Sequence, residues 1–112
     1  MSLVALLGLL AGQASGQATA TLAGQVLDAD GSGIPAAAVT LSNVATGFER
    51  SARTDETGLF SLRNIPLQGY ELEISAEGFG VHREALSLRS NVPVERLVTL
   101  QIAAQSETLE VT

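Results

Sequence analysis

The residue types most suggestive of chemistry in this sequence are the oxygen donors of one short loop. The segment Asp28–Gly33 has the pattern D-A-D-G-S-G, which matches the opening of a helix–loop–helix calcium site. The twelfth position of such a loop carries a bidentate glutamate, but here it is Val39. We therefore interpret the segment as a surface turn in which Asp side chains bond nearby backbone. Weak Ca²⁺ binding with help from Asp55 or Glu56 is the alternative.

A second group of candidates consists of residues used in acid–base catalysis and sugar binding. His82 is the only histidine and cysteine is absent, so we interpret it as an exposed histidine of a strand. Glu71 and Glu73 would lie about 7 Å apart on one strand face and imitate a glycosidase carboxylate pair. That face is expected to be open to water, which favours a solvating role. Tyr70 occupies a strand position that should face the core, so its ring is not expected to stack on a sugar.

Three arginines complete the candidate binding residues. Arg50, Arg53 and Arg63 fall on predicted strands, where cross-strand ion pairs are worth ~0.2–1 kcal/mol each. The expected carboxylate partners are Glu49, Glu71 and Glu73. The sequence thus predicts no catalytic residue, no cofactor-binding residue and no metal ligand, and it leaves ligand-binding residues undetermined. We expect a protein that is not an enzyme.

Composition narrows the classes of partner. The chain has 112 residues, enough for one domain, and carries twelve acidic side chains against six basic ones, for a net charge of −6. Nucleic acids and anionic membranes need a basic face, so both are disfavoured as partners. Because cysteine is absent, the core must hold without disulfides.

The N-terminal segment has the character of a secretory signal peptide. No charged residue precedes Asp28, and Leu3–Leu10 is an apolar run followed by small polar residues. The run is too short to span ~30 Å of hydrocarbon as a helix, which needs about 20 residues. We predict a signal peptide over residues 1–20, cut after Ala18 or Ala20, although the usual basic start is missing. The mature chain is expected to contain no transmembrane segment.

The rest of the chain shows the pattern of an all-β domain. Apolar residues alternate with polar ones, and Gly, Asp, Asn and Pro recur about every 8–12 residues, which is typical of a sandwich or barrel. The clearest alternation runs through Tyr70–Ala76. Phe48–Thr54 is polar enough to lie at an edge or on a solvated face, and Gly58 ends a turn that needs a positive φ. The predicted strands are Thr21–Leu27, Ala38–Val44, Phe48–Thr54, Leu59–Arg63, Tyr70–Ala76, Val81–Leu88 and Val94–Ile102, with Thr108–Thr112 as a further short strand or a linker.

Strand parity also predicts which side chains are buried. Within each predicted strand, alternate apolar residues should face one core. Phe79 is expected to fold back from its turn and cap that core. The predicted core consists of Leu22, Val26, Val39, Leu41, Phe60, Leu62, Tyr70, Leu72, Ile74, Val98, Leu100 and Ile102.

Two segments resemble the carboxypeptidase regulatory-like domain family. Thr54–Phe79 contains T-D-E-T-G-L-F and, after a loop, Y-E-L-E-I-S-A-E-G-F, and Gly24–Leu41 (G-Q-V-L-D-A-D-G-S-G-I-P-A-A-A-V-T-L) resembles the family's opening. The resemblance implies a prealbumin-like β-sandwich of about seven strands, related to carbohydrate-binding folds. The implied organisation is a signal peptide over 1–20, the sandwich over 21–105 and an outgoing linker or short strand over 106–112.

The order of these segments is similar to the start of TonB-dependent outer-membrane receptors. In those receptors such a domain precedes the plug, and a stretch like S-E-T-L-E-V-T (Ser106–Thr112) joins the two. The resemblance implies an exported, non-catalytic interaction or structural module, located in the periplasm or at the outer membrane. Its expected partner is a protein or an adjacent receptor domain. A carbohydrate-binding module is the alternative, implied by the fold relationship alone.

Overall fold

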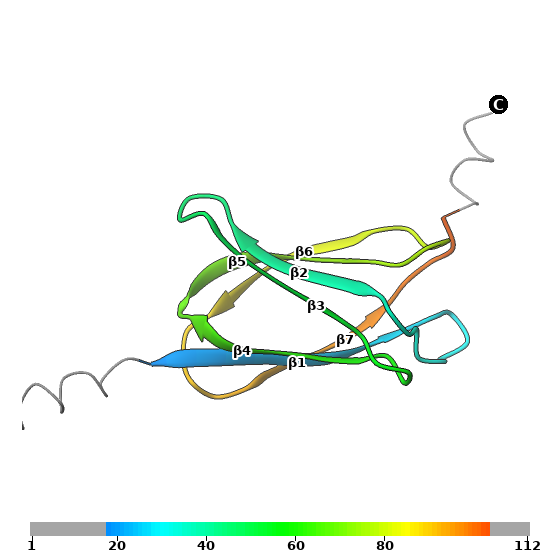
Figure 1. The fold of residues 1–112 in the computed structure, drawn as a ribbon, viewed down its shortest axis with the longest axis horizontal. Helices are drawn as coiled ribbons and strands as arrows, with labels where there is room; N and C mark the ends of the chain where they lie inside the picture. The colour runs from blue at the N-terminus through cyan, green and yellow to red at the C-terminus, as the bar shows by residue number, and fades with distance from the viewer. Residues whose placement is uncertain (1–17, 104–112) are drawn as a thin grey trace, which may run out of the picture.

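The domain is a sandwich of two β-sheets, seen in a computed structural model that describes residues 18–103 (Figure 1). Seven strands and no helix occur among these residues, as the sequence predicted. The strands are β1 (Thr19–Leu27), β2 (Ala38–Asn43), β3 (Phe48–Arg53), β4 (Leu59–Pro66), β5 (Gln68–Ser75), β6 (His82–Leu88) and β7 (Val94–Thr99).

The two sheets join strands that are distant in sequence. The three-stranded sheet has the order β4-β1-β7, with β1 antiparallel to β4 and parallel to β7. The four-stranded sheet has the order β3-β2-β5-β6 and is antiparallel throughout. Figure 1 shows the two sheets as separate layers, with β1, β4 and β7 on one side. As predicted, β3 is an edge strand.

Period-two alternation places one face of every strand in the shared core. In β5, Tyr70, Leu72 and Ile74 are buried, while Glu71 is exposed. Phe79 packs against the core from its turn, as expected. Eleven of the twelve residues predicted to be buried are buried, and the set extends to Ala20, Ile34, Ala37, Ile65, Leu86 and Leu88.

Ile102 was predicted to be buried, and that prediction is wrong. Its side chain is 55% exposed. β7 ends at Thr99, and Leu100 then donates its backbone N–H to the carbonyl of Leu27. Beyond Leu100 the chain leaves the sheet and forms an isolated bridge between Ile102 and Phe79. Strand alternation therefore predicts burial correctly as far as Leu100 and fails at Ile102, because alternation holds only while the backbone stays extended.

The predicted leader falls almost entirely outside the described residues, and so does the segment Thr108–Thr112. β1 begins at Thr19, two residues before the predicted start of the first strand. Between residues 18 and 103 there is no helix with the length and hydropathy needed to cross a bilayer.

Candidate functional site

The motif T-D-E-T-G-L-F begins with a buried threonine that ties two segments together. The Thr54 hydroxyl donates to the carbonyl of Ile34 at 2.6 Å and accepts the backbone N–H of Ala37 at 2.8 Å. Two backbone hydrogen bonds reinforce this link, from Ala36 to Thr54 and from Thr54 to Ala37. Thr54 is the one buried polar residue among those the structure describes. It anchors the loop after β1 to the end of β3.

We expect Thr54→Val to destabilise the domain by about 2–6 kcal/mol, because two buried backbone groups lose their partner and each costs roughly 1–3 kcal/mol. Thr54→Ser keeps the hydroxyl and should cost less than about 1.5 kcal/mol, the range for one buried methyl group. Urea unfolding of both variants beside the wild type measures the difference. A larger loss in Thr54→Ser than in Thr54→Val would mean that packing of the methyl group, which Val keeps, and not the hydroxyl, holds the loop.

Asp55, the second residue of the motif, organises the following turn. Its Oδ1 accepts the N–H of Thr57 at 2.9 Å, the hydroxyl of Thr57 at 2.8 Å and the N–H of Leu59 at 3.0 Å. These bonds, the one from Leu59 first, hold the pKa of Asp55 below its usual value. The side chain is thus a carboxylate that is already engaged, and it has a structural role in the turn.

Two further motif residues, Gly58 and Phe60, lie where backbone segments pack closely. Gly58 has a φ of +87°, as predicted for this turn. A Cβ atom at Gly58 would lie 2.5 Å from the carbonyl oxygen of Val26. Phe60 pairs with Gly24 on β1, and its ring occupies the space where a side chain on Gly24 would lie. The family motif is therefore explained by the fold.

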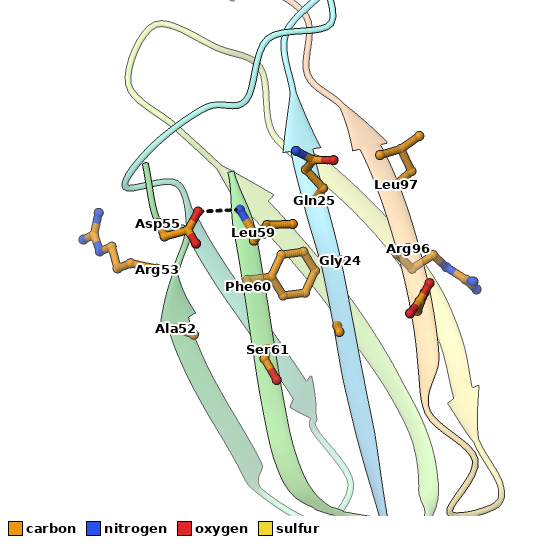
Figure 2. A pocket seen from close by; sticks show the side chains of 12 residues that line it. Gly24, Gln25, Ala52, Arg53, Asp55, Leu59, Phe60, Ser61, Arg96 and Leu97 are labelled. Atoms are coloured by element: carbon orange, nitrogen blue, oxygen red, sulfur yellow. Dashed lines mark hydrogen bonds between the residues drawn. The ribbon is translucent and has the colours of Figure 1, made fainter. Parts of the chain in front are cut away.

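An open groove runs over the outer face of the three-stranded sheet and has a volume of about 780 Å³ (Figure 2). Cross-strand pairing places Leu59, Gln25 and Leu97 in one row across β4, β1 and β7. The next row contains Ser61, Ala23 and Glu95. The remaining lining residues are Gly24, Ala52, Arg53, Asp55, Phe60 and Arg96.

The groove offers mainly apolar contacts. Leu59 is 49% exposed and Leu97 is 68% exposed, so two large aliphatic side chains flank the small residues of β1. Gln25 is held in place by a bond from its Nε2 to the carbonyl of Thr57 at 2.9 Å. Among the twelve residues that line this groove there is neither histidine nor cysteine. Its chemistry suits the docking of an apolar surface.

The sequence did not identify this groove, although one signal was present. In its predicted strand Leu97 occupies a position that faces away from the core. Leu59 also faces outward, because it directly precedes Phe60, which faces the core. Large aliphatic residues at outward positions are informative when they cluster. Their clustering depends on the order β4-β1-β7, which strand patterning alone does not give.

The Asp28–Gly33 segment forms a turn around its first aspartate. Oδ1 of Asp28 accepts the N–H of Asp30 at 2.9 Å and the N–H of Ser32 at 3.0 Å. The backbone N–H of Asp28 also donates to the carbonyl of Ser32. This geometry is that of a surface turn. Residues 18–103 contain no group of three or more His, Cys, Asp or Glu side chains arranged to hold a metal ion.

We expect millimolar Ca²⁺ to leave the melting temperature of the domain unchanged, because Asp28 already bonds its own backbone and Val39 replaces the closing carboxylate. Thermal unfolding with Ca²⁺ and with EDTA tests this. A ligand at a hundred times its Kd would add about 2.7 kcal/mol. A rise in melting temperature that disappears in Asp30→Ala would contradict the turn interpretation.

His82 was predicted to be an exposed histidine of a strand; it is the first residue of β6, but its side chain is only partly exposed. Its side chain is 31% exposed, and Nε2 lies 2.9 Å from Oε1 of Glu84. Oε2 of Glu84 accepts Nε of Arg96 at 2.6 Å. Because β6 and β7 belong to different sheets, this ion-pair network links the two sheets at one edge of the sandwich.

The network makes stability depend on pH through Glu84. The Arg96 hydrogen bond first, and then the His82 bond, lower the pKa of Glu84 below its usual value of 4.5. A carboxyl with a lowered folded-state pKa stabilises the fold above the unfolded-state pKa, and that contribution is lost as pH falls through the folded-state pKa. Glu84→Gln should therefore lower the urea midpoint at pH 7, and its deficit should shrink below about pH 4.5. A lowering of the urea midpoint by Glu84→Gln that is the same at pH 7 and below about pH 4.5 would contradict this.

The arginine pairings predicted from the sequence do not form. Within the described chain, the ion pairs of arginine are Arg83 with Glu73 at 3.6 Å and Arg96 with Glu84. β2 lies between β3 and β5, so Arg50 and Arg53 are separated from Glu71 and Glu73, and Arg63 belongs to the other sheet. Instead, Arg50 donates to the carbonyl of Arg63 and Arg53 donates to that of Ala36.

Seven strands in two sheets, with an open groove on one face, define the class of this protein as a small β-sandwich module. The family model of the carboxypeptidase regulatory-like domain matches residues 21–103. The chain belongs to this family, as its sequence motifs indicated. No curated protein sequence matches the chain.

Several solved structures share the fold. A streptococcal ancillary pilin superposes with a TM-score of 0.62 at 18% identity, over 79% of this chain and 34% of the pilin. A proposed carbohydrate-binding protein from Bacteroides uniformis ATCC 8492 gives 0.60 at 13% identity, over 74% and 41%. A 3-chlorocatechol 1,2-dioxygenase from Rhodococcus opacus 1CP gives 0.64 at 14% identity, over 79% and 62%. The chain spans less than two thirds of each neighbour, and the likeness shows the fold alone.

Proposed function

We propose that this domain is a non-catalytic interaction module, exported to the periplasm and attached to an outer-membrane receptor of the TonB-dependent type. Its partner is an adjacent receptor domain or another protein. The observation that carries the proposal is the apolar groove of the three-stranded sheet, where Leu59 and Leu97 stand exposed on either side of β1. Exposed aliphatic side chains that cluster on one sheet face favour a docking surface.

Two of the four charged side chains that line the groove, Asp55 and Arg96, support a binding role over a catalytic one. Asp55 accepts three hydrogen bonds from its own turn, and Arg96 is paired with Glu84. General acid–base catalysis needs a group able to gain or release a proton near the working pH. The pKa of Asp55 is lowered, so this carboxyl stays ionised at neutral pH.

The proposed export rests on the charge-free leader and is consistent with the position of β1. Ala20 is buried and pairs with Ile65 of β4. Removal of Ala20 would take a core residue from β1, so of the two expected cleavage sites we propose the one after Ala18. N-terminal sequencing of the mature protein should therefore find Thr19 as its first residue.

Because the chain contains no cysteine, single-cysteine labelling can test location and docking together. Leu97→Cys places a thiol in the groove, and Val44→Cys places one at a site that is 93% exposed in the turn after β2. The full gene would be expressed in a Gram-negative host and treated with a maleimide that reaches the periplasm but not the cytoplasm. Val44→Cys should be labelled in intact cells, whereas Leu97→Cys should react more slowly in cells than in the purified domain.

The control and the groove variant separate the two parts of the proposal. Failure of Val44→Cys to react in intact cells, with normal reaction after lysis, would contradict export. Equal labelling of Leu97→Cys in cells and in the purified domain would show that nothing covers the groove. Either variant should keep the wild-type fold, because both side chains are exposed.

Carbohydrate binding is the second candidate function, favoured by the structural likeness to the proposed carbohydrate-binding protein. The aromatic side chains weigh against it, because Phe60 and Tyr70 are buried and Phe48 and Phe79 pack against the core. Sugar binding usually relies on exposed aromatic faces. Calorimetric titration of the purified domain with neutral oligosaccharides distinguishes the candidates, since measurable heats would favour the sugar-binding function.

A further inference from the structure

The cationic side chains of this acidic protein are unevenly distributed. Of the six arginines, Arg83 and Arg96 belong to ion pairs. Three of the remaining four belong to the two edge strands that meet at one side of the sandwich, Arg50 and Arg53 to β3 and Arg63 to β4, and Arg50 and Arg63 line one groove. We refer to Arg50, Arg53 and Arg63 as the arginine edge. None of its members is within ion-pairing distance of a carboxylate in the part of the chain that the structure describes.

Two of these guanidinium groups are held in position by the backbone. Nη1 of Arg50 donates to the carbonyl of Arg63 at 2.9 Å, and Nη1 of Arg53 donates to the carbonyl of Ala36 at 3.0 Å. The guanidinium of Arg50 also lies 5.4 Å from the centre of the Phe48 ring. Backbone carbonyls and an aromatic ring orient a guanidinium without neutralising its charge. Less side-chain entropy is then lost when an anion binds.

A groove of about 560 Å³ opens between the two edge strands. Its polar lining side chains are guanidinium, hydroxyl and amide groups, from Arg50, Arg63, Ser51, Ser61 and Asn64. No carboxylate lines it, in a chain with twelve acidic residues. Guanidinium forks match the geometry of carboxylates and bind them in bidentate fashion.

The shape of the site favours an extended polypeptide. β3 is the outer strand of one sheet and β4 is the outer strand of the other, so each has one side without a strand neighbour. Edge strands offer backbone donors and acceptors to an added strand. An extended segment along this edge would use the backbone groups and would present alternate side chains to the arginines.

We propose that the arginine edge binds an extended acidic segment of a partner polypeptide. Carboxylates of its Glu or Asp residues contact the guanidinium groups of Arg63 and Arg53, and its backbone lies along the β3–β4 edge. The partner is therefore recognised by a charge opposite to that of most of this domain's surface. This site adjoins the apolar groove that Leu59 and Leu97 flank, because Arg53 and Ser61 also line that groove, but its recognition chemistry is ionic instead of apolar.

The test uses fluorescence anisotropy with a labelled peptide of alternating Thr and Glu, and the same peptide with Gln in place of Glu. The wild-type domain should bind the Glu peptide more tightly. Arg63→Gln and Arg53→Gln should each weaken binding about tenfold, the effect of losing one charge-assisted contact. Arg89→Gln is the matched control, because Arg89 is exposed, lies after β6 and forms no ion pair with residues 18–103. It should change affinity by less than about twofold.

A second variant keeps every arginine. Ser61→Glu places a carboxylate in the groove and should weaken binding of the Glu peptide, because like charges repel at short range. Urea midpoints equal to that of the wild type establish that the variants are folded. Equal binding of the Gln peptide, or an Arg89→Gln variant as weak as Arg63→Gln, would overturn the proposal. Tighter binding of an oligogalacturonate than of the Glu peptide would overturn the choice of a polypeptide.

Discussion

Gly58→Ala is expected to destabilise the domain by roughly 2–6 kcal/mol, a large share of the 5–15 kcal/mol typical of a domain. The φ of +87° costs an L-residue about 1–3 kcal/mol. The added Cβ would also lie 2.5 Å from the carbonyl oxygen of Val26 and 3.0 Å from Cα of Gly33. Both neighbours are backbone atoms and cannot turn away, so overpacking adds about 1–3 kcal/mol.

Gly47→Ala separates these two contributions. Gly47 has a φ of +77°, but no atom lies within 4 Å of the position its Cβ would take. This substitution should cost only the backbone strain, about 1–3 kcal/mol. The difference between the urea midpoints of the two variants then measures the close approach at Gly58. Equal midpoints would mean that the turn relaxes and that the three segments around Gly58 are not in tight contact.

The crowding at Gly58 corrects an expectation that the sequence alone favours. Asn tolerates a positive φ better than a β-branched residue, so turn chemistry predicts that Gly58→Asn is much milder than Gly58→Val. In the structure the carbonyl of Val26 accepts the N–H of Ile34 directly beside Gly58. Any Cβ meets that carbonyl. We therefore expect Asn and Val to be similarly damaging at this position.

The seven strands were predictable because each depends on local alternation. Tyr70–Ala76 alternates without interruption, and β5 covers nearly the same residues. Polar composition predicted an edge position or a solvated face for β3, and the strand lies at an edge, where one free side tolerates charge. The ends of strands were less predictable, because they depend on contacts that follow from the fold. β4, for example, extends to Pro66, three residues beyond the predicted end at Arg63.

The surfaces were less predictable, because they join residues from distant parts of the chain. The apolar groove needs β1 between β4 and β7, and the parallel pairing of β1 with β7 spans most of the domain sequence. The link from His82 through Glu84 to Arg96 likewise needs β6 and β7 to meet at one edge. Neither sequence spacing nor residue type indicates these neighbours.

The family motif illustrates how a conspicuous pattern can be structural. Thr54 anchors a loop, Asp55 closes a turn and Gly58 allows three backbone segments to meet. Phe60 fills the space over Gly24. A local contact requires each of these residue types, so we expect substitutions at these positions to lower the stability of the domain. The positions open to a partner are outward-facing residues such as Leu97 and Arg63. The fold does not require a particular residue type at these positions.

Leu72→Ala and Ile102→Ala should differ sharply, although strand parity predicts both side chains to be buried. Leu72 is fully buried in β5, a strand paired on both sides by β2 and β6. Its truncation removes contacts and leaves a cavity, at a cost of about 2–5 kcal/mol. Ile102 is 55% exposed beyond the end of β7, so its truncation should change stability by no more than about 0.5 kcal/mol.

Urea unfolding of the two variants beside the wild type decides whether the core ends at Leu100. Both substitutions remove a branched aliphatic side chain of the same size, so the comparison holds side-chain chemistry constant and varies only the position. A midpoint for Ile102→Ala as low as that for Leu72→Ala would mean that the chain continues in the core past Leu100. A small effect for both would contradict the packing of β5 itself, since Leu72 faces Leu41 across the β2–β5 pair.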